Sequence, residues 1–316
     1  MENVVEVKNL VKRYKERVAL DHLNLEIRKG EIFGLLGPNG SGKTTAINCI
    51  LSLLQYDKGE ICVMGRPMEE NAYDRKRKIG VVMQNVAVFD ELTVYENIDY
   101  FCGLYIEDKE KRKQCVEEAI EFVELSEFRR YYPKKLSGGL LRRLNIACGI
   151  AHKPELIFFD EPTVAVDPQS RNKILEGIQM LNEQGATIIY TSHYMEEVEK
   201  ICSRIAILDR GKVLAQGTAD ELKAMIKNTE TIRLEVPQIS EDILKRLYEL
   251  PHVYQGTYED GMMTLQCSGG SDNLLNVLHL LEGEKVSLGR IYSERPTLND
   301  VFLEITGKTL RDEEAK

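Results

Sequence analysis

Several features are missing from this 316-residue sequence, and each absence excludes a class of protein. There is no tryptophan, and 23 glycines and 9 prolines are too few for a fibrous or low-complexity chain. No apolar run approaches the roughly 20 residues needed to cross a bilayer. The opening residues alternate Val with polar and charged residues, without the basic and apolar regions of a secretory signal. We therefore expect a cytoplasmic protein of about two domains.

The cysteines and the charge balance exclude further classes of site and partner. The seven cysteines are scattered, without CxxC pairs or histidines at metal-ligand spacing, a pattern that indicates buried thiols. The chain has 42 Lys and Arg against 51 Asp and Glu, a formal net charge of −9. Because this acidic balance leaves no basic surplus to neutralise a phosphate backbone, we expect no nucleic-acid partner.

Residues 1–225 alternate short apolar runs with helical patterns. Ile32–Leu36, Leu156–Phe159 and Thr187–Thr191 are nearly all apolar, as strands covered by helices on both faces must be, and they predict a parallel sheet. Other predicted strands, several of them beside polar turns that favour antiparallel pairing, are Glu6–Leu10, Leu23–Ile27, Glu60–Val63, Ile79–Met83, Ile205–Leu208 and Val213–Ala215. Helical spacing dominates from about residue 93 to residue 151 and predicts an inserted helical subdomain.

Residues 226–316 have a different pattern and predict a separate, small α+β domain. Strand and helix patterns follow in the order βαββαβ, which is that of a ferredoxin-like unit, and Val286–Ser293 is its last predicted strand. Asp260-Gly261 between two strands is a hairpin signal. Pro296-Thr297 opens a closing amphipathic helix that we expect to pack on the sheet.

A glycine-rich segment follows the strand Ile32–Leu36 and opens a helix. It fits the pattern GxxxxGK[ST] with Gly37, Pro38, Asn39, Gly40, Ser41, Gly42, Lys43, Thr44 and Thr45. In such a loop backbone N–H groups surround phosphates, Lys43 contacts the β- and γ-phosphates, and the Thr44 hydroxyl ligates Mg²⁺. The glycine order excludes the dinucleotide pattern GxGxxG. The segment therefore predicts a nucleoside triphosphate site.

Two carboxylates, Asp160 and Glu161, come directly after the buried strand Leu156–Phe159. Taken alone, such a pair is more often a solvated strand end. In P-loop proteins, however, this edge of the sheet faces the phosphates. We therefore predict that Asp160 holds Mg²⁺ and that Glu161 is the catalytic base for the attacking water.

Four further motifs resemble those of ATP-binding cassette (ABC) ATPases. Leu136-Ser137-Gly138-Gly139 resembles the signature motif, and the run from Glu161 to Pro168 resembles the Walker B and D-loop segment. Thr191-Ser192-His193 resembles the switch histidine segment, and Gln84 resembles the Q-loop glutamine. The resemblance covers about residues 4–225 and implies a P-loop cassette with a parallel sheet core, an antiparallel β subdomain and a helical subdomain.

The resemblance also implies roles for residues that spacing alone does not assign. Tyr14 would stack on adenine, and Ser137, Gly138 and Gly139 would contact the γ-phosphate. Gln84 would bind nucleotide and Mg²⁺, and His193 would be catalytic.

Some positions depart from the family or carry no motif. Leu140 stands where many members have Gln, and Ala165 stands where many have Gly. We expect Ala165 to remove the option of a positive φ and to stiffen a contact between subunits. Arg142 and Arg143 are interpreted as a solvated helix face.

One chain carries one phosphate loop and one signature, so the resemblance implies a head-to-tail homodimer with two ATP molecules between the subunits. It also implies transmembrane permease subunits as partners. Next to Gln84, the apolar residues Ala87, Val88, Phe89 and Leu92 are the candidate docking surface. Burial in the interface with the helical subdomain is an equally good interpretation of these residues.

The closing run from Arg295 to Gly307 resembles the end of ABC-2 type exporter ATPases of the daunorubicin-resistance-like group. It implies an ATPase subunit that powers an exporter from the inner face of the cell membrane, with ATP as substrate and Mg²⁺ as cofactor. A soluble ABC ATPase not tied to transport and an importer ATPase are the alternatives. A DNA-repair ATPase would need a long coiled-coil insertion between Lys43 and Asp160, and the sequence has none.

Overall fold

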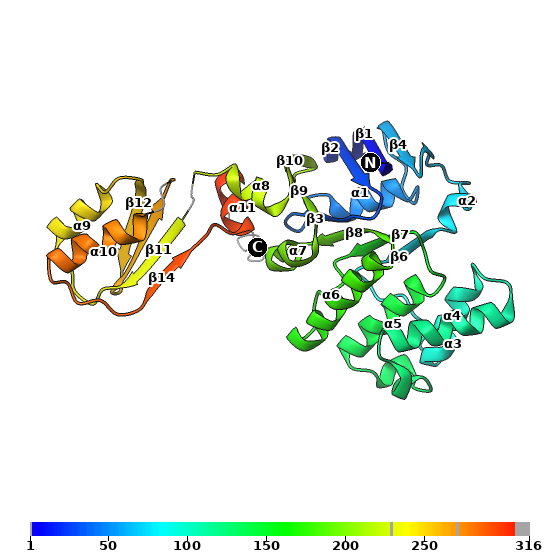
Figure 1. Ribbon diagram of the computed structural model, residues 1–316. Coiled ribbons are helices and arrows are strands. Elements are labelled where there is room, and N and C mark those ends of the chain that lie inside the picture. The colour runs from blue at the N-terminus through cyan, green and yellow to red at the C-terminus, as the bar shows by residue number, and fades with distance from the viewer. Residues whose placement is uncertain (1, 228–229, 270–271, 307–316) are drawn as a thin grey trace. The chain divides into compact units, whose positions relative to one another are not determined.

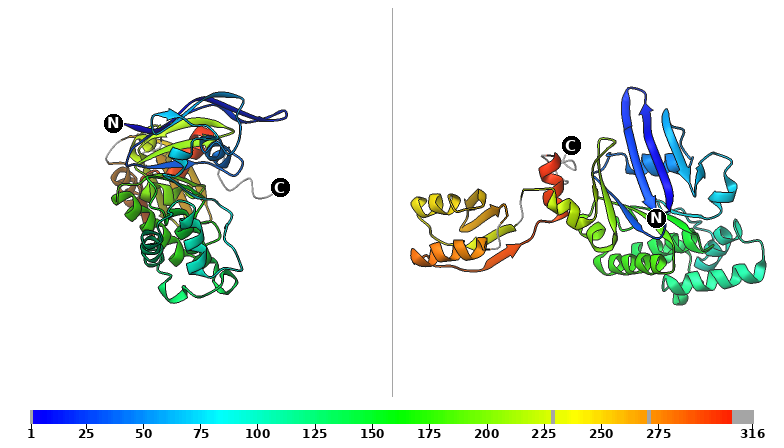
Figure 2. Two further views of the ribbon diagram at one scale, coloured as in Figure 1. Left: turned by 90° about the vertical axis from the view of Figure 1, so that its right-hand side faces the viewer. Right: turned by 45° about the horizontal axis from the view of Figure 1, so that its top comes forward.

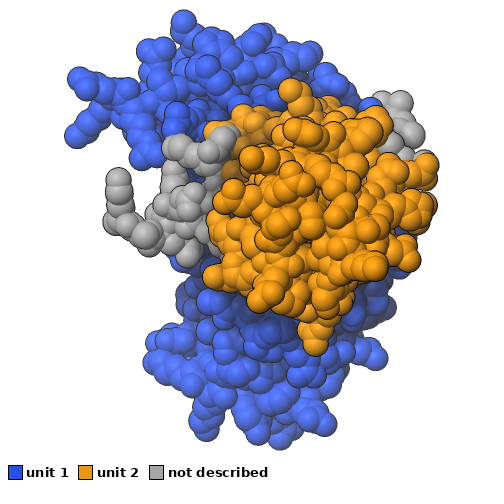
Figure 3. Space-filling model, turned by 90° about the vertical axis from the view of Figure 1, so that its left-hand side faces the viewer, with its two compact units in different colours: residues 1–216 blue, residues 217–316 orange. Residues whose placement is uncertain are grey.

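The computed structural model describes residues 2–227, 230–269 and 272–306. The chain divides into two compact units, residues 1–216 and 217–316 (Figures 1 and 3). This division falls before α8 (Ala219–Ala224), ahead of the domain boundary expected after residue 225. The reason is that α8 contacts α11 (Leu298–Thr306), which belongs to the second unit.

The first unit is built on a six-stranded sheet in the order β10-β9-β3-β8-β7-β6. Its strands are β3 (Ile32–Leu36), β6 (Ile79–Val82), β7 (Leu156–Asp160), β8 (Thr187–Ser192), β9 (Arg204–Asp209) and β10 (Lys212–Gly217). Strand β3 runs parallel to β8 and β9, and β7 runs parallel to β6 and β8. Every residue of β3, β7 and β8 is buried, which confirms the prediction of a helix-covered parallel sheet.

A second, antiparallel sheet has the order β2-β1-β4-β5. It consists of β1 (Asn3–Tyr14), β2 (Arg17–Arg28), β4 (Lys58–Val63) and β5 (Arg66–Pro67), and Figure 2 shows the long β1–β2 hairpin. In β2, Leu23, Leu25 and Ile27 are buried while the residues between them are exposed, as alternation in a one-sided sheet requires. The buried face shares one core with β3 and with α1 (Lys43–Ile50).

Three mutually contacting helices form the helical subdomain: α3 (Val94–Gly103), α4 (Lys109–Phe122) and α5 (Gly138–Ile150). Figure 1 shows them on the opposite side of the parallel sheet from the antiparallel sheet. Thr93 and Glu96 close a capping box at the start of α3, and Asp108 caps α4. The remaining helices of this unit are α2 (Tyr73–Lys76), α6 (Pro168–Glu183) and α7 (Met195–Ile201), with short 3₁₀ turns at Ser126–Phe128 and Pro133–Lys135. Across the described ranges, no helix is both long and apolar enough to cross a membrane.

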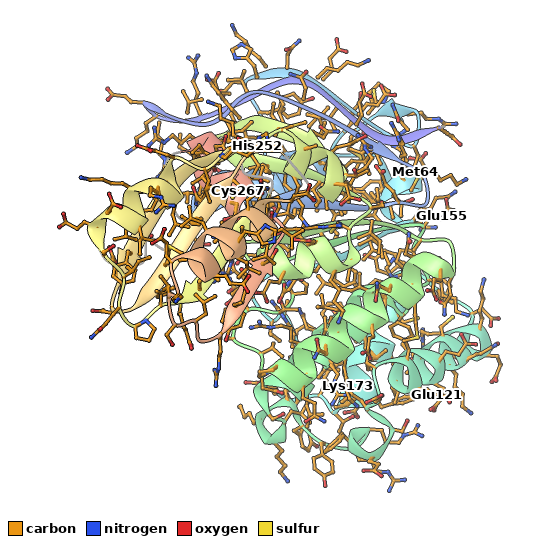
Figure 4. All side chains as sticks on the ribbon, turned by 60° about the vertical axis from the view of Figure 1, so that its left-hand side comes forward. Met64, Glu121, Glu155, Lys173, His252 and Cys267 are labelled. Atoms are coloured by element: carbon orange, nitrogen blue, oxygen red, sulfur yellow. The ribbon has the colours of Figure 1, made fainter. Side chains whose placement is uncertain are left out.

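The second unit contains a four-stranded antiparallel sheet in the order β12-β13-β11-β14. Its elements are β11 (Glu230–Glu235), α9 (Glu241–Tyr248), β12 (Val253–Glu259), β13 (Met262–Cys267), α10 (Asn273–Gly283) and β14 (Ile291–Glu294). This order confirms the ferredoxin-like prediction. Residues Asp260 and Gly261 turn the β12–β13 hairpin at φ of 50° and 76°. Cys267, labelled in Figure 4, is fully buried in the core that α9 and α10 share with the sheet.

Two predictions for the second unit were wrong in detail. The last strand begins at Ile291 and not at Val286, because the Val286 N–H bonds to the Leu281 carbonyl at the end of α10. Helix α11 buries Leu298, Val301 and Phe302 as its amphipathic pattern requires, but its main contact is with helix α8. Gly307, the last residue of the closing run, lies outside the described residues.

The α8–α11 contact yields a test of the domain boundary. A chain that ends after Gln216 should stay folded, since it removes α8 and α11 together. A chain that ends after Ile226 keeps α8 but exposes Leu222, which is fully buried in the intact chain. We expect the longer truncation product to be the more aggregation-prone of the two, as measured by thermal melting and light scattering. Equal behaviour of the two products would show that α8 does not depend on α11.

Candidate functional site

The carboxyl ends of the parallel strands bring the predicted site residues together. Strand β3 leads into the phosphate loop, β7 ends at Asp160, and β8 ends one residue before His193. In the register of the sheet, Leu36 pairs with Ser192 and Asp160 pairs with Thr191. Residues from distant parts of the sequence therefore meet at one edge, which is where open α/β sheets bind ligands.

The phosphate loop has the backbone that its glycines permit. Gly42 has φ of 112°, and a Cβ there would lie 2.8 Å from the Ala19 carbonyl oxygen, so a side chain is excluded on both counts. Helix α1 begins at the next residue, Lys43. The Lys43 ammonium donates to the carbonyl oxygens of Gly37 at 2.8 Å and Pro38 at 3.1 Å.

An open pocket of about 540 Å³ lies over the loop. Its lining brings together much of the predicted site: Tyr14, Asn39, Gly40, Gly42, Lys43, Thr44, Thr45, Gln84 and Glu161. Tyr14 stands at the end of β1 with 49% of its surface exposed. Arg17, which sequence reasoning missed, also lines the pocket, and a Cβ on Gly40 would lie 3.5 Å from its guanidinium.

The carboxylate of Asp160 sits between two hydroxyl groups. Thr44 Oγ1 donates to Asp160 Oδ2 at 2.8 Å, and Thr191 Oγ1 donates to Asp160 Oδ1 at 2.7 Å. Hydroxyl and carboxylate oxygens are the ligands that Mg²⁺ prefers, so Thr44 and Asp160 fit this cation. Gln84, the third predicted metal residue, faces elsewhere in this structure, because its Nε2 donates to Glu161 Oε2 at 3.3 Å.

Glu161 is buried between two other residues of the predicted site. It is 4% exposed, and its carboxylate lies 3.0 Å from Lys43 Nζ and 3.4 Å from His193 Nδ1. Burial favours the neutral acid, but the neighbouring His193 and the charge of Lys43 outweigh it and hold the pKa of Glu161 below its usual range. Its backbone has φ of 48°, and its N–H bonds to Thr191. Glu161 is therefore an ionised carboxylate held in a strained backbone conformation.

Arg142 corrects an expectation from the sequence, because it is not on a solvated helix face. Its side chain is 3% exposed, and its guanidinium donates to the carbonyl oxygens of Met83, Gln84, Glu161 and Pro162 at 2.6–3.1 Å. Burial lowers the pKa of Arg142, and the nearby carboxylates of Asp160 and Glu161 oppose this shift. Arg142 thus joins the segment after β6 to the segment after β7. Arg143 is also turned inward, since it donates to the Val123 carbonyl.

One sequence pattern could have predicted that Arg142 is buried. It lies three residues after Gly139 and three before Asn145, and residues at this spacing share a face of a helix. All three are buried on α5.

The signature residues stand apart from the pocket of their own chain. Ser137 caps α5 by accepting a hydrogen bond from the Leu140 N–H, and nothing lies within 4 Å of a Cβ placed on Gly138. Ser137, Gly138 and Gly139 are absent from the described lining of the pocket, and so is His193. The exposed helix start leaves backbone N–H groups available to an anion from another molecule.

Ala165 corrects a second expectation. We expected alanine to remove the option of a positive φ, yet Ala165 adopts φ of 59°. The turn is held by hydrogen bonds from Val164 N to Glu161 O and from Val166 N to Thr163 O. An alanine in this conformation costs roughly 1–2 kcal/mol, which the surrounding turn must offset.

The segment after Gln84 is tied to the helical subdomain. The Asn97 amide on α3 bonds to both backbone groups of Phe89 and to the Leu92 carbonyl, and Asn145 accepts from the Ala87 N–H. Phe89 is 42% exposed and contacts Tyr100 edge-on at 4.9 Å between ring centroids. Val88 and Leu92 are half-buried. Of the predicted docking residues, Ala87 and Phe89 are thus at the surface.

Comparison with known proteins agrees with this geometry. The ABC transporter family matches residues 20–164, and the C-terminal domain of DrrA1-3-like ATP-binding proteins matches residues 217–306. The linearmycin resistance ATP-binding protein LnrL of Bacillus subtilis is 38% identical over 98% of this chain and 100% of its own length. The daunorubicin resistance ATP-binding protein DrrA3 of Streptomyces coeruleorubidus is 32% identical over 99% of both chains.

Solved structures support the same assignment. The dimeric ABC transporter cassette MJ0796 is 30% identical, with a TM-score of 0.63 over 68% of this chain and 98% of its own. A post-hydrolysis state of that cassette, bound to ADP and Pi, is 31% identical with the same TM-score and coverage. The chain therefore belongs to the ABC transporter family, as an ATP-binding and ATP-hydrolysing subunit of the ABC-2 type exporter group.

Proposed function

We propose that ATP binds in the pocket over the phosphate loop and that Glu161 is the base for the attacking water. The observation that carries this proposal is the position of the Glu161 carboxylate at the end of the sheet, 3.0 Å from Lys43 Nζ and 3.4 Å from His193 Nδ1. Adenine would stack on Tyr14, and Gly37–Thr45 would surround the phosphates. The triphosphate then competes for the Lys43 ammonium, which leaves the Glu161 carboxylate available to orient water.

The metal and the remaining polar groups have proposed roles as well. Thr44 and Asp160 would hold Mg²⁺, which supplies positive charge against the phosphates. Gln84 would join this shell by moving its amide from Glu161. His193 would stabilise the γ-phosphate from its place beside Glu161.

We infer that the working unit is a head-to-tail homodimer. Ser137 and Gly138 are exposed at the start of α5, and they do not line the pocket of their own chain. A second copy would supply its signature to that pocket, and ATP would be sandwiched between the two surfaces.

The membrane subunits would dock on an apolar patch formed by Phe89, Tyr100 and Leu104, which we call the α3 patch. These residues are 42%, 48% and 60% exposed. The patch is connected to the pocket, because the segment that carries Phe89 begins at Gln84 and is held by Asn97 and Arg142. In this proposal the protein would work at the inner face of the cell membrane without insertion.

The proposed roles of Lys43 and Glu161 predict that one variant loses ATP binding and the other loses hydrolysis. Lys43→Ala should weaken ATP binding about 100-fold, since it removes a cation that the triphosphate requires. Glu161→Gln should keep binding, lower kcat by about 100-fold or more, and accumulate an ATP-dependent dimer. Equilibrium binding of a fluorescent ATP analogue, phosphate release and size exclusion with ATP and Mg²⁺ measure the three effects. Normal hydrolysis by Glu161→Gln would refute the role of this residue.

The docking assignment is tested by charge on the α3 patch. The double variant Tyr100→Glu/Leu104→Glu should lose co-purification with the membrane subunits while its soluble ATPase activity stays near wild type. Tyr73→Glu/Leu53→Glu is the matched control, because it changes the same residue types at 69% and 65% exposure elsewhere on the cassette. The α3 patch is not the docking surface if the Tyr100→Glu/Leu104→Glu variant still co-purifies with the membrane subunits. The same conclusion follows if both double variants lose co-purification.

A further inference from the structure

A buried carboxylate outside the pocket contacts three elements of the site. Glu197 lies on α7, is 4% exposed, and does not line the nucleotide pocket. Its Oε2 accepts hydrogen bonds from Tyr190 OH at 2.7 Å, Thr163 Oγ1 at 2.8 Å and Ser192 Oγ at 3.1 Å. Its Oε1 lies 3.3 Å from Arg171 Nε on α6. A buried carboxylate is stable only with such partners, so this geometry is closely defined.

The partners of Glu197 stand next to the two proposed catalytic side chains. Thr163 is two residues after Glu161, and Ser192 directly precedes His193. Ser192 Oγ also accepts from the Tyr194 N–H at 2.9 Å, so the backbone on both sides of His193 is tied to this carboxylate. On the other side, the Arg171 guanidinium lies 4.7 Å from the Tyr194 ring centroid.

We propose that Glu197 is a positioning residue for ATP hydrolysis, which holds the turn after Glu161 and the segment carrying His193 in one fixed relation. This inference rests on the proposed roles of Glu161 and His193. Glu197 touches neither the pocket nor its ligand, so it acts on the chemical step through geometry alone. A displacement of about 1 Å between reacting groups costs up to roughly 100-fold in rate.

A carboxylate matches this position better than an amide. Glutamine has one oxygen and one NH₂ group, whereas Glu197 accepts hydrogen bonds on one oxygen and faces Arg171 with the other. If the glutamine oxygen faces the three hydroxyls, its NH₂ group meets the Arg171 guanidinium, donor against donor. If the amide turns round, the three hydroxyls lose their common acceptor and must reorient to accept from the NH₂ group. Either orientation disturbs the contacts at unchanged side-chain volume.

The test compares Glu197→Gln with Glu31→Gln, a matched control. Glu31 is also a buried carboxylate, 8% exposed and 3.0 Å from Arg204, but it precedes β3 at the edge of the sheet away from the phosphate loop. We expect Glu197→Gln to lower kcat about tenfold with the KM for ATP within about twofold of wild type. Glu31→Gln should leave both kinetic constants unchanged, and thermal melting reports the stability of each variant.

A second variant keeps the proposal testable if Glu197→Gln folds poorly. Thr163→Val removes one hydrogen-bond donor at nearly constant side-chain volume and should lower kcat about threefold. Combining it with Glu197→Gln should lower kcat little further, because both changes act on the same contact. Three outcomes would overturn the inference. The first is a wild-type kcat in both Glu197→Gln and Thr163→Val, and the second is a change confined to the KM for ATP. The third is an equal loss of kcat in Glu31→Gln. Glu161→Gln in the same assay separates the two proposals. If Glu161→Gln is inactive while the Glu197 variant is normal, only the positioning role fails.

Discussion

The parallel pairing of β3, β8 and β7 is the constraint on which the site depends. Leu36 pairs with Ser192, and Asp160 pairs with Thr191, so the three strands end at the same level. A shift of one residue in either pairing would turn alternate side chains to the other face of the sheet. The complete burial of these strands prevents such a shift, since each face carries apolar side chains against helices. Core packing therefore sets the distances between Lys43, Asp160 and Glu161.

The site concentrates charge that would be costly to bury singly. Lys43, Arg142, Glu161 and Glu197 are each at most 5% exposed. Removing an ion from water costs several kcal/mol, and a neighbouring opposite charge with full hydrogen bonding offsets that cost. Lys43 is paired with Glu161, Arg142 bonds to four carbonyl oxygens, and Glu197 accepts three hydroxyl bonds. Loss of a partner leaves the buried charge less compensated, so each of these groups depends on its own partners.

Sequence patterns predicted the features that depend on residues close together in the chain. The nine strands expected in the cassette and the order of the ferredoxin-like sheet follow from apolar periodicity and turn residues, and the structure contains them. The phosphate loop and Glu161 were recognisable because their chemistry needs residues at fixed spacing. The partners of Arg142 and Glu197 were not recognisable, because they are backbone carbonyls and hydroxyls from other elements. Nor does the sequence around Ala165 show that hydrogen bonds hold it at positive φ.

The first two turns of helix α5 combine an exposed start with a buried arginine. Ser137 and Gly138 lie at the surface at its start. One turn further along, Arg142 donates hydrogen bonds to the carbonyl oxygens of Gln84 and Glu161. A displacement of the exposed start would therefore be passed to the nucleotide pocket of the same chain through about one turn of helix. In the proposed homodimer each signature would touch the other subunit's ATP. Occupancy of one pocket would then alter the geometry of the second, and the two sites of such a dimer would turn over cooperatively and not as independent enzymes.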